Sequence, residues 1–278
     1  MKVGVSLPVR EMAGDFSAIR DFAQAAEELG LTHLRIPDQV MRPGSAYLNE
    51  PMMMLAHISA ITEKIELVPS VIILPARQTV HFAKQAAELD NLSAGRLRLG
   101  IGVGSSQEEY EYLGMQFSNR GKRCSEQMHL LKKLWSQHQV NFSGDYHEIS
   151  GAGLNPLPIQ QPIPMWIGAR SIPSPAVIKR IGEISDGWFV LCSPEDIHGL
   201  REKISDTAKK IGRCPKEIGE EAGVAVVGER EKEWKTRVLR WKELGLSHLC
   251  LRTLGGGLKV SEHITKLEEV MKELPEAL

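Results

Sequence analysis

Short apolar segments alternate with longer amphipathic segments along the chain, and this rhythm constrains the fold more than any other feature. The apolar segment KVGVSLP at residues 2–8 precedes apolar residues at helical spacing over 16–30. The pattern recurs until SHLCLRT at 247–253 is followed by a last amphipathic segment at 259–274. Near-continuous apolar strands that alternate with helices indicate a parallel sheet covered by helices.

Counting these pairs gives eight strand-and-helix units. The expected strands are residues 2–8, 32–38, 65–74, 96–104, 163–169, 186–192, 221–228 and 247–253. Eight units in 278 residues suit a closed (β/α)8 TIM barrel of the α/β class better than an open sheet. No linker-like stretch divides the chain, so we expect a single domain over residues 1–278.

One region departs from the rhythm. Residues 140–162, VNFSGDYHEISGAGLNPLPIQQP, contain turn residues around SGD and several prolines. This composition predicts a short hairpin and surface crossover inserted before the fifth strand.

The balance of charge excludes several classes of partner. Lys and Arg total 34 against 35 Asp and Glu, which leaves no basic field for nucleic acid or a membrane surface. No apolar run approaches the roughly 20 residues that span a bilayer, and the N-terminus does not resemble a signal peptide. The four scattered cysteines show no metal-ligand spacing. We therefore expect a cytoplasmic protein with reduced thiols and no bound metal.

Alternating glycines mark the fourth expected strand, RLRLGIGVG. A dinucleotide-binding fingerprint needs a third glycine where this chain has Ser105 or Gln107, so that motif is absent. Glycines in a strand permit close approach by another backbone or by a flat ring. Packing within the barrel accounts best for Gly100 and Gly102, and ligand approach accounts best for Gly104.

In a barrel of this type, the chemistry sits on the loops that follow the strands. The segment Gly168-Ala169-Arg170-Ser171 ends the fifth expected strand and precedes a helix. Backbone N–H groups at a helix start, with an arginine beside them, can bind a phosphate. A helix N-cap without a ligand is the alternative.

Four blocks resemble the bacterial luciferase-like family of flavin- and deazaflavin-dependent oxidoreductases. They are HFAKQAAELDNLSAGRLRLGIGVG, EEYEYLGMQFSNRGKRCSEQMHLLKKLW, VNFSGDYHEISGAGLNPLPIQQPIPMWIGA and ISDGWF. They occur in the order and spacing of the family, and the resemblance extends from the first strand to the last helix. It implies a (β/α)8 barrel that binds FMN or coenzyme F420, usually in a homo-oligomer.

The resemblance also assigns expectations to single residues. Ser70 and Val71 match a bulge, often with a non-proline cis peptide, that supports the flavin-type ring from behind. Asp38 and Gln39 stand where F420-dependent members often have Asp-His. A glutamine cannot act as an acid or base near neutral pH, and Asp38 has the alternative of pairing with an arginine. Tyr110 is expected to cover the ring or contact the substrate.

These expectations lead to an oxidoreductase with Asp38, Gln39 and Tyr110 as polar steering groups. The ring would lie on Ser70 and Val71 beside Gly104, with its phosphate at 168–171. F420 would support hydride transfer with a small organic substrate, whereas FMN, reduced by a separate reductase, would support monooxygenation. The alternatives are a non-catalytic flavin- or deazaflavin-binding protein and an unrelated barrel enzyme for a phosphorylated substrate. Weaker candidates are Arg10, Glu11, Arg42, His57 and Arg77.

Overall fold

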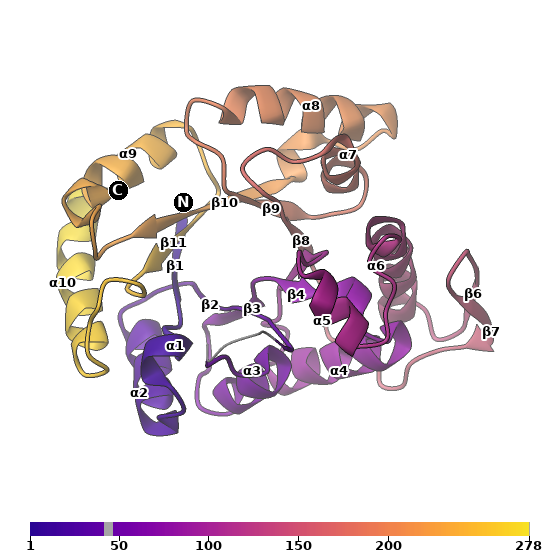
Figure 1. Cartoon of the computed structure of the whole chain (residues 1–278), viewed down its shortest axis with the longest axis horizontal. Helices are drawn as coiled ribbons and strands as arrows, with labels where there is room; N and C mark the ends of the chain where they lie inside the picture. The colour runs from indigo at the N-terminus through magenta and orange to yellow at the C-terminus, as the bar shows by residue number, and fades with distance from the viewer. Residues whose placement is uncertain (42–46, 278) are drawn as a thin grey trace.

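Parallel strands form one sheet that closes into a barrel (Figure 1). The computed structural model describes residues 1–41 and 47–277. Within that part of the chain the strands of the sheet are β1 (Lys2–Ser6), β2 (His33–Ile36), β3 (Glu66–Pro69), β4 (Ile72–Ile73), β5 (Leu99–Gly102), β8 (Met165–Gly168), β9 (Gly187–Val190), β10 (Gly219–Ala225) and β11 (His248–Arg252). Their hydrogen-bonded order is β3-β2-β1-β11-β10-β9-β8-β5-β4.

The barrel closes between β3 and β5. The Leu67 N–H donates to the Arg96 carbonyl at 2.8 Å, and the Arg98 N–H donates to the Leu67 carbonyl at 3.0 Å. Farther along, β4 continues the contact by pairing with β5, so β3 and β4 are two halves of one interrupted strand. Counted this way, the sheet has the eight strand positions that the sequence predicts, and the (β/α)8 barrel is confirmed.

Helices surround the strands on the outside of the barrel (Figure 1). The long ones are α2 (Phe16–Glu28), α3 (Pro51–Ser59), α4 (Thr79–Leu92), α6 (Arg120–Ser136), α7 (Pro175–Glu183), α8 (Ile197–Lys210), α9 (Trp234–Glu243) and α10 (Glu262–Ala277). Short helices α1 (Val9–Met12) and α5 (Gln107–Tyr112) follow β1 and β5. The 3-10 turns are η1 (Leu74–Ala76), η2 (Pro215–Glu217) and η3 (Glu231–Glu233). None of the helices in the described residues is long and apolar enough to cross a membrane.

The predicted insertion before the fifth strand position is a hairpin that projects beside α6 (Figure 1). Its strands β6 (Val140–Ser143) and β7 (Glu148–Ala152) are antiparallel. His147 fixes the hairpin to the barrel, because its Nδ1 lies 2.7 Å from the Glu126 carboxylate on α6 and its Nε2 lies 2.5 Å from the Thr79 hydroxyl on α4. The insertion is thus confirmed.

The interior of the barrel differs from the core between sheet and helices. The outer core is almost entirely aliphatic and aromatic, whereas the interior combines Trp166 and Phe189 with charged side chains. The Arg98 guanidinium lies 4.2 Å from the centroid of the Trp166 ring, and that of Arg35 lies 4.5 Å from the centroid of Phe189. These cation–π contacts lower the cost of burying the two arginines. Arg35 reaches Ser70 at the carboxyl end of the barrel, whereas Arg98 pairs with Glu66 at the start of β3.

Candidate active site

The break between β3 and β4 is the centre of the candidate site. The peptide bond between Ser70 and Val71 is cis, as the family resemblance implies. The Ser70 N–H donates to the Ile36 carbonyl at 2.6 Å, and the Ser70 hydroxyl accepts from Arg35 Nη2 at 2.5 Å. Both bonds hold the bulge to β2 at the edge of the barrel.

The Val71 side chain lies between two glycines of neighbouring strands. A Cβ atom on Gly102 would lie 2.5 Å from Val71 Cγ2, and one on Gly168 would lie 2.5 Å from Val71 Cγ1. Any larger residue at either position would collide with the bulge. Gly100 meets Pro69 in a similar way, since its Cβ would lie 2.4 Å from that carbonyl. The packing explanation for Gly100 and Gly102 is confirmed.

A buried ion-pair network supports the bulge from below. Glu221 of β10 is fully buried and accepts from Arg35 Nη1 at 2.8 Å and from Arg98 Nη1 at 2.9 Å. Burial disfavours the carboxylate, but His33, Arg35 and Arg98 outweigh it and hold the pKa of Glu221 well below its usual range. Glu221 therefore fixes Arg35, and Arg35 in turn fixes Ser70.

A group with metal-ligand chemistry lies in the same network. The ligand atoms of His33, Glu221 and Cys250 lie within 4.8 Å of one another, and all three residues are buried. However, both carboxylate oxygens of Glu221 already accept from arginines. Two guanidinium groups at this distance oppose a cation, so the group acts as part of the ion-pair network rather than as a metal centre.

A cavity of about 750 Å³ opens in front of the bulge. It brings together five of the residues predicted from the sequence, which are Asp38, Gln39, Ser70, Val71 and Gly104. Gly104 has a φ of +65°, and a Cβ there would lie 2.8 Å from Ile73 Cγ2, so backbone conformation and packing both favour glycine. The cavity lies within the size range of small-molecule and cofactor sites.

Asp38 lines this cavity, which we call the mouth of the barrel, and its carboxylate is already hydrogen-bonded. Its carboxylate accepts from the Ile73 N–H at 2.9 Å and from Arg77 Nη2 at 2.9 Å. Burial raises the pKa of Asp38, although Arg77 and the backbone bond oppose the rise. Gln39 is half-buried beside it. The arrangement matches the alternative in which Asp38 pairs with an arginine.

Tyr110 lies behind the mouth. It is fully buried against Phe117, its hydroxyl donates to the Val103 carbonyl at 2.7 Å, and burial raises its pKa. The preceding residue, Glu109, lines the cavity instead and accepts from the Val40 and Met41 N–H groups at 2.7 and 3.2 Å. A contact between Tyr110 and substrate stays a prediction, and the burial of its hydroxyl argues against it.

Sequence reasoning missed Glu109. A local signal exists, because Ser106 and Glu109 have the spacing of a capping box at the start of α5. The Ser106 hydroxyl does accept from the Glu109 N–H at 3.2 Å. The Glu109 carboxylate, however, binds the backbone of the loop after β2, a long-range contact that the spacing cannot predict.

The segment Gly168–Ser171 lies beside the bulge, because Gly168 packs on Val71. Ala169 is buried, whereas Arg170 and Ser171 are exposed. α7 begins shortly after, and its N-cap residue Ser174 makes no side-chain capping bond. The first residue of α7, Pro175, has no N–H, and the Val177 and Ile178 N–H groups donate to the Ser174 carbonyl at 2.9 and 3.0 Å. The exposed Arg170 is therefore the clearest donor for an anion in this segment.

The weaker candidates are dispersed. Arg77 bridges Asp38 and Glu50, at 2.9 and 3.0 Å. Glu11 accepts from the Gly255 N–H at 2.7 Å through one oxygen. His57 lies on α3 by an outer, largely apolar pocket, and Arg42 falls outside the described residues.

Comparison with solved structures shows the same fold in proteins of low sequence identity. The monooxygenase RslO1 from Streptomyces bottropensis has a TM-score of 0.83 and 19% identity, with each chain covered completely. An F420-dependent secondary alcohol dehydrogenase in complex with an F420-acetone adduct has a TM-score of 0.81 and 17% identity, with 97% of each chain covered.

Sequence comparison adds a relative and a family. An F420-dependent glucose-6-phosphate dehydrogenase of Kineococcus radiotolerans is 29% identical over 78% of this chain and 66% of its own length. The model of the family described as luciferase-like monooxygenase matches residues 1–248. Since that match spans most of the chain, this protein belongs to the luciferase-like monooxygenase family.

Proposed function

We propose that this protein is an oxidoreductase that binds F420 or FMN at the carboxyl end of its barrel. The ring lies against Ser70 and Val71, and the cofactor phosphate lies at Gly168–Ser171 before α7. The observation that carries the proposal is the position of Val71, whose side chain lies between Gly102 and Gly168 at the wall of the large mouth cavity.

The residues present fit such a cofactor. Val71 and the glycines beside it form an apolar wall without projecting side chains, which suits one face of a flat ring. The exposed Arg170, in the loop that leads into α7, offers a charged donor for a phosphate. The relative named as an F420-dependent enzyme supports a deazaflavin.

The bound cofactor would supply hydride transfer in the case of F420 and oxygen chemistry in the case of reduced FMN. The protein chain itself positions the bound molecules and shields them from water. Glu109 binds the backbone N–H groups of Val40 and Met41, and Arg77 holds Asp38 in place. Gln39 can donate to or accept from the ring or substrate, but it cannot transfer a proton. The site therefore orients the reactants, and proton transfer, where the reaction needs it, falls to other groups.

Titration of FMN, riboflavin and F420, followed by fluorescence quenching, tests the proposal. We expect binding of FMN or F420 at micromolar concentration, and weaker binding of riboflavin, which has the same ring as FMN without the phosphate. Arg170→Ala should weaken the binding of FMN or F420 about tenfold, because a charge-assisted hydrogen bond is lost, and should leave riboflavin unchanged. Lys179→Ala is the matched control, because the Lys179 side chain is also exposed but lies farther along the chain, on α7. Failure of both FMN and F420 to bind at micromolar concentration would overturn the proposal.

A non-catalytic cofactor-binding protein is the second candidate. The ion pair between Asp38 and Arg77 favours it, because it occupies one of the two carboxylates that line the mouth. Steady-state oxidation of added F420H2 or FMNH2 separates the two. Tight cofactor binding without turnover on any acceptor would identify the binding protein. If the cofactor is FMN, the enzyme would also need a separate reductase as partner. We propose that the protein is a homo-oligomer, whether it is an enzyme or a binding protein.

A further inference from the structure

A small cavity of about 190 Å³, which we call the side cavity, adjoins the mouth at the carboxyl end of the barrel. Pro37 and Ser70 line both spaces, so the two meet at the bulge. The other walls of the side cavity come from the ends of β1, β2 and β11, from α1, and from residues that follow these strands. A molecule in the side cavity would therefore lie beside the ring site proposed at Ser70 and Val71.

Two arginines lie at the same level of the barrel wall, on either side of Ser6. Arg35 of β2 and Arg252 of β11 each pair directly with Ser6 of β1 in the parallel register. Neighbouring strands are about 4.8 Å apart, so the two arginine Cα atoms are roughly 10 Å apart. Residues paired in this way project from the same face of the sheet, and for Arg35 that face is the barrel interior, where its guanidinium meets Glu221. All three paired residues line the side cavity.

The side chains of both arginines reach toward β10. Arg35 Nη1 donates to the Glu221 carboxylate at 2.8 Å. A Cβ atom on Gly223 would lie 3.4 Å from Arg252 Nε and 3.7 Å from its Cζ, so this guanidinium group lies over that glycine. Glu221 and Gly223 are two residues apart on one strand and therefore face the same side of it. The two guanidinium groups thus converge inside the barrel, where a single small anion in the side cavity can contact both.

Arg252 carries the uncompensated positive charge of the side cavity. Among the described residues, no hydrogen bond or ion pair reaches its side chain, and its Nε is buried. Arg35, by contrast, is paired with Glu221 and also donates to the Ser70 hydroxyl, which uses two of its five N–H donors. Its Nε is likewise buried without a partner. Both arginines therefore have unused donors, but they contribute only one surplus charge.

Glu11 limits the charge of the molecule that the side cavity can accept. It lines the cavity from α1, and one of its carboxylate oxygens accepts from the Gly255 N–H at 2.7 Å. The other oxygen, Oε2, is buried without a partner. This negative charge repels a second negative charge on a bound molecule. Arg10 also lines the cavity, but its side chain is exposed and water and salt screen its charge. The balance favours a monoanion over a dianion.

We propose that Arg35 and Arg252 bind the carboxylate of a small monocarboxylic acid substrate in the side cavity. A planar carboxylate accepts hydrogen bonds from the parallel N–H groups of a guanidinium, and the volume of the cavity admits only a small molecule. Calling the acid a substrate rests on the proposed function, whereas the binding of its carboxylate does not. Held beside Ser70, the acid can extend its carbon chain toward the ring proposed at Val71.

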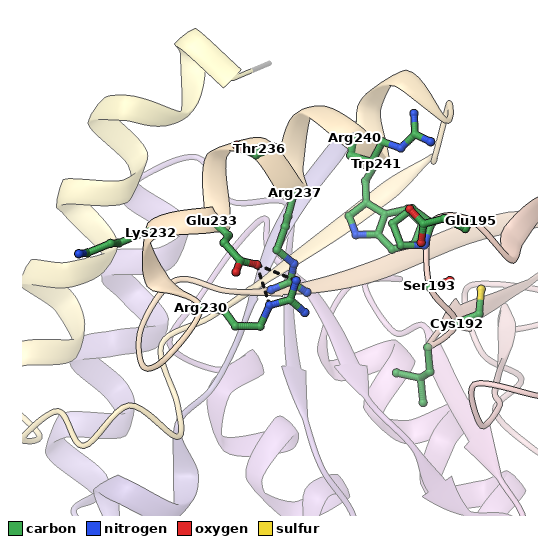
Figure 2. Close-up of a pocket in the computed structure, with 12 residues that line it drawn as sticks. Cys192, Ser193, Glu195, Arg230, Lys232, Glu233, Thr236, Arg237, Arg240 and Trp241 are labelled. Atoms are coloured by element: carbon green, nitrogen blue, oxygen red, sulfur yellow. Dashed lines mark hydrogen bonds and ion pairs between the residues drawn. The ribbon is translucent and has the colours of Figure 1, made fainter.

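Binding of propionate, measured by titration calorimetry at constant ionic strength, tests the site. Arg252→Gln should weaken binding at least about tenfold, because a charge-assisted hydrogen bond is lost, and Arg252→Lys should recover part of the affinity. Arg35→Lys keeps a cation beside Glu221 but removes the planar donor group, and should weaken binding severalfold. Arg240→Gln is the matched control, because the exposed Arg240 lines a separate cavity between α9 and the loop after β9 (Figure 2) and lies 3.5 Å from Glu243. It should change affinity less than twofold.

The variant Glu11→Gln tests the choice of a monoanion. Glutamine keeps a side-chain oxygen that can accept from the Gly255 N–H, so the contact between α1 and the loop after β11 is preserved. At about pH 8, methyl phosphate is a dianion, because the second pKa of a phosphate monoester is about 6. The natural protein should bind propionate more tightly than methyl phosphate. Glu11→Gln should narrow this difference severalfold, because the repelling charge is removed.

Three outcomes overturn the proposal. Propionate affinity unchanged in Arg252→Gln, with the melting temperature intact, would show that the arginines are not the site. Tighter binding of methyl phosphate than of propionate to the natural protein would indicate a dianion instead. Displacement of propionate by FMN or F420 would assign the arginines to the cofactor. The propionate titrations need no cofactor, so propionate binding that depends on Arg252 would stand even where FMN and F420 fail to bind, and that failure would overturn the proposed function alone.

Discussion

Glu221 is the residue on which the interior of the barrel depends. It compensates Arg35 and Arg98 in a space that water does not reach, and its side chain is fully buried. Removing one member of a buried ion pair leaves the others without compensation, which costs more than the pair itself contributes. The effect should extend to the mouth, because Arg35 also donates to the Ser70 hydroxyl.

We expect Glu221→Gln to lower the free energy of unfolding by about 3–5 kcal/mol, measured by urea denaturation. Asp21→Asn is the control, because Asp21 pairs with Arg20 on the surface, where the side chains are 51% and 48% exposed. Loss of such a pair should cost less than about 1 kcal/mol. Equal effects of the two substitutions would contradict the importance assigned to Glu221.

At the level of elements, the interrupted strand β3–β4 depends on glycines in its neighbours. Gly102 of β5 and Gly168 of β8 leave the space that Val71 occupies. The bulge at Ser70 and Val71 therefore forms one packing unit with β5 and β8, and the proposed ring and phosphate sites both border this unit. A change in either glycine should alter cofactor binding by displacing Val71, and at Gly168 it also alters the proposed phosphate site.

Gly168→Ala should weaken FMN or F420 binding at least about tenfold and lower stability by about 1–3 kcal/mol, because the new methyl group displaces Val71. Gly199→Ala on α8 is the matched control, since its Cβ meets no atom within 4 Å. There the substitution should stabilise the helix by about 0.5–1 kcal/mol and leave cofactor affinity unchanged. Unaltered affinity in Gly168→Ala would show that the bulge does not define the ring site.

The elements also show what the sequence could predict. Strand and helix positions follow from apolar periodicity, so the barrel and the hairpin before β8 were predictable. The break after Pro69 was not visible in the apolar run of residues 65–74 and came only from family resemblance. Glu109 acts through partners far away in the chain, the Val40 and Met41 N–H groups, and no local pattern reports such contacts.

For the whole molecule, several titratable groups make stability fall as the pH is lowered. The most affected is His248 on β11, beside Trp166, where burial and then the positive charges of Arg98 and His33 lower its pKa to about 3. The unfolded chain has an ordinary histidine pKa of about 6.5 at this position. Between those values the unfolded state binds a proton that the folded state excludes, so the free energy of unfolding decreases on acidification. His33 acts in the opposite direction, since Glu221 outweighs its burial and raises its pKa.

His248→Gln isolates this contribution. Glutamine does not titrate, so the loss of unfolding free energy between pH 7 and pH 5 should be smaller in the variant than in the natural protein. This window lies above the range where ordinary carboxylates titrate, which separates the histidine from Glu221 and from Glu27 and Glu126, whose pKa values are also lowered. Urea denaturation at the two pH values measures the difference, with His198→Gln on the exposed face of α8 as control. An identical loss in the variant and the natural protein would mean that the barrel admits a proton at His248 without cost, and that the acid sensitivity originates elsewhere.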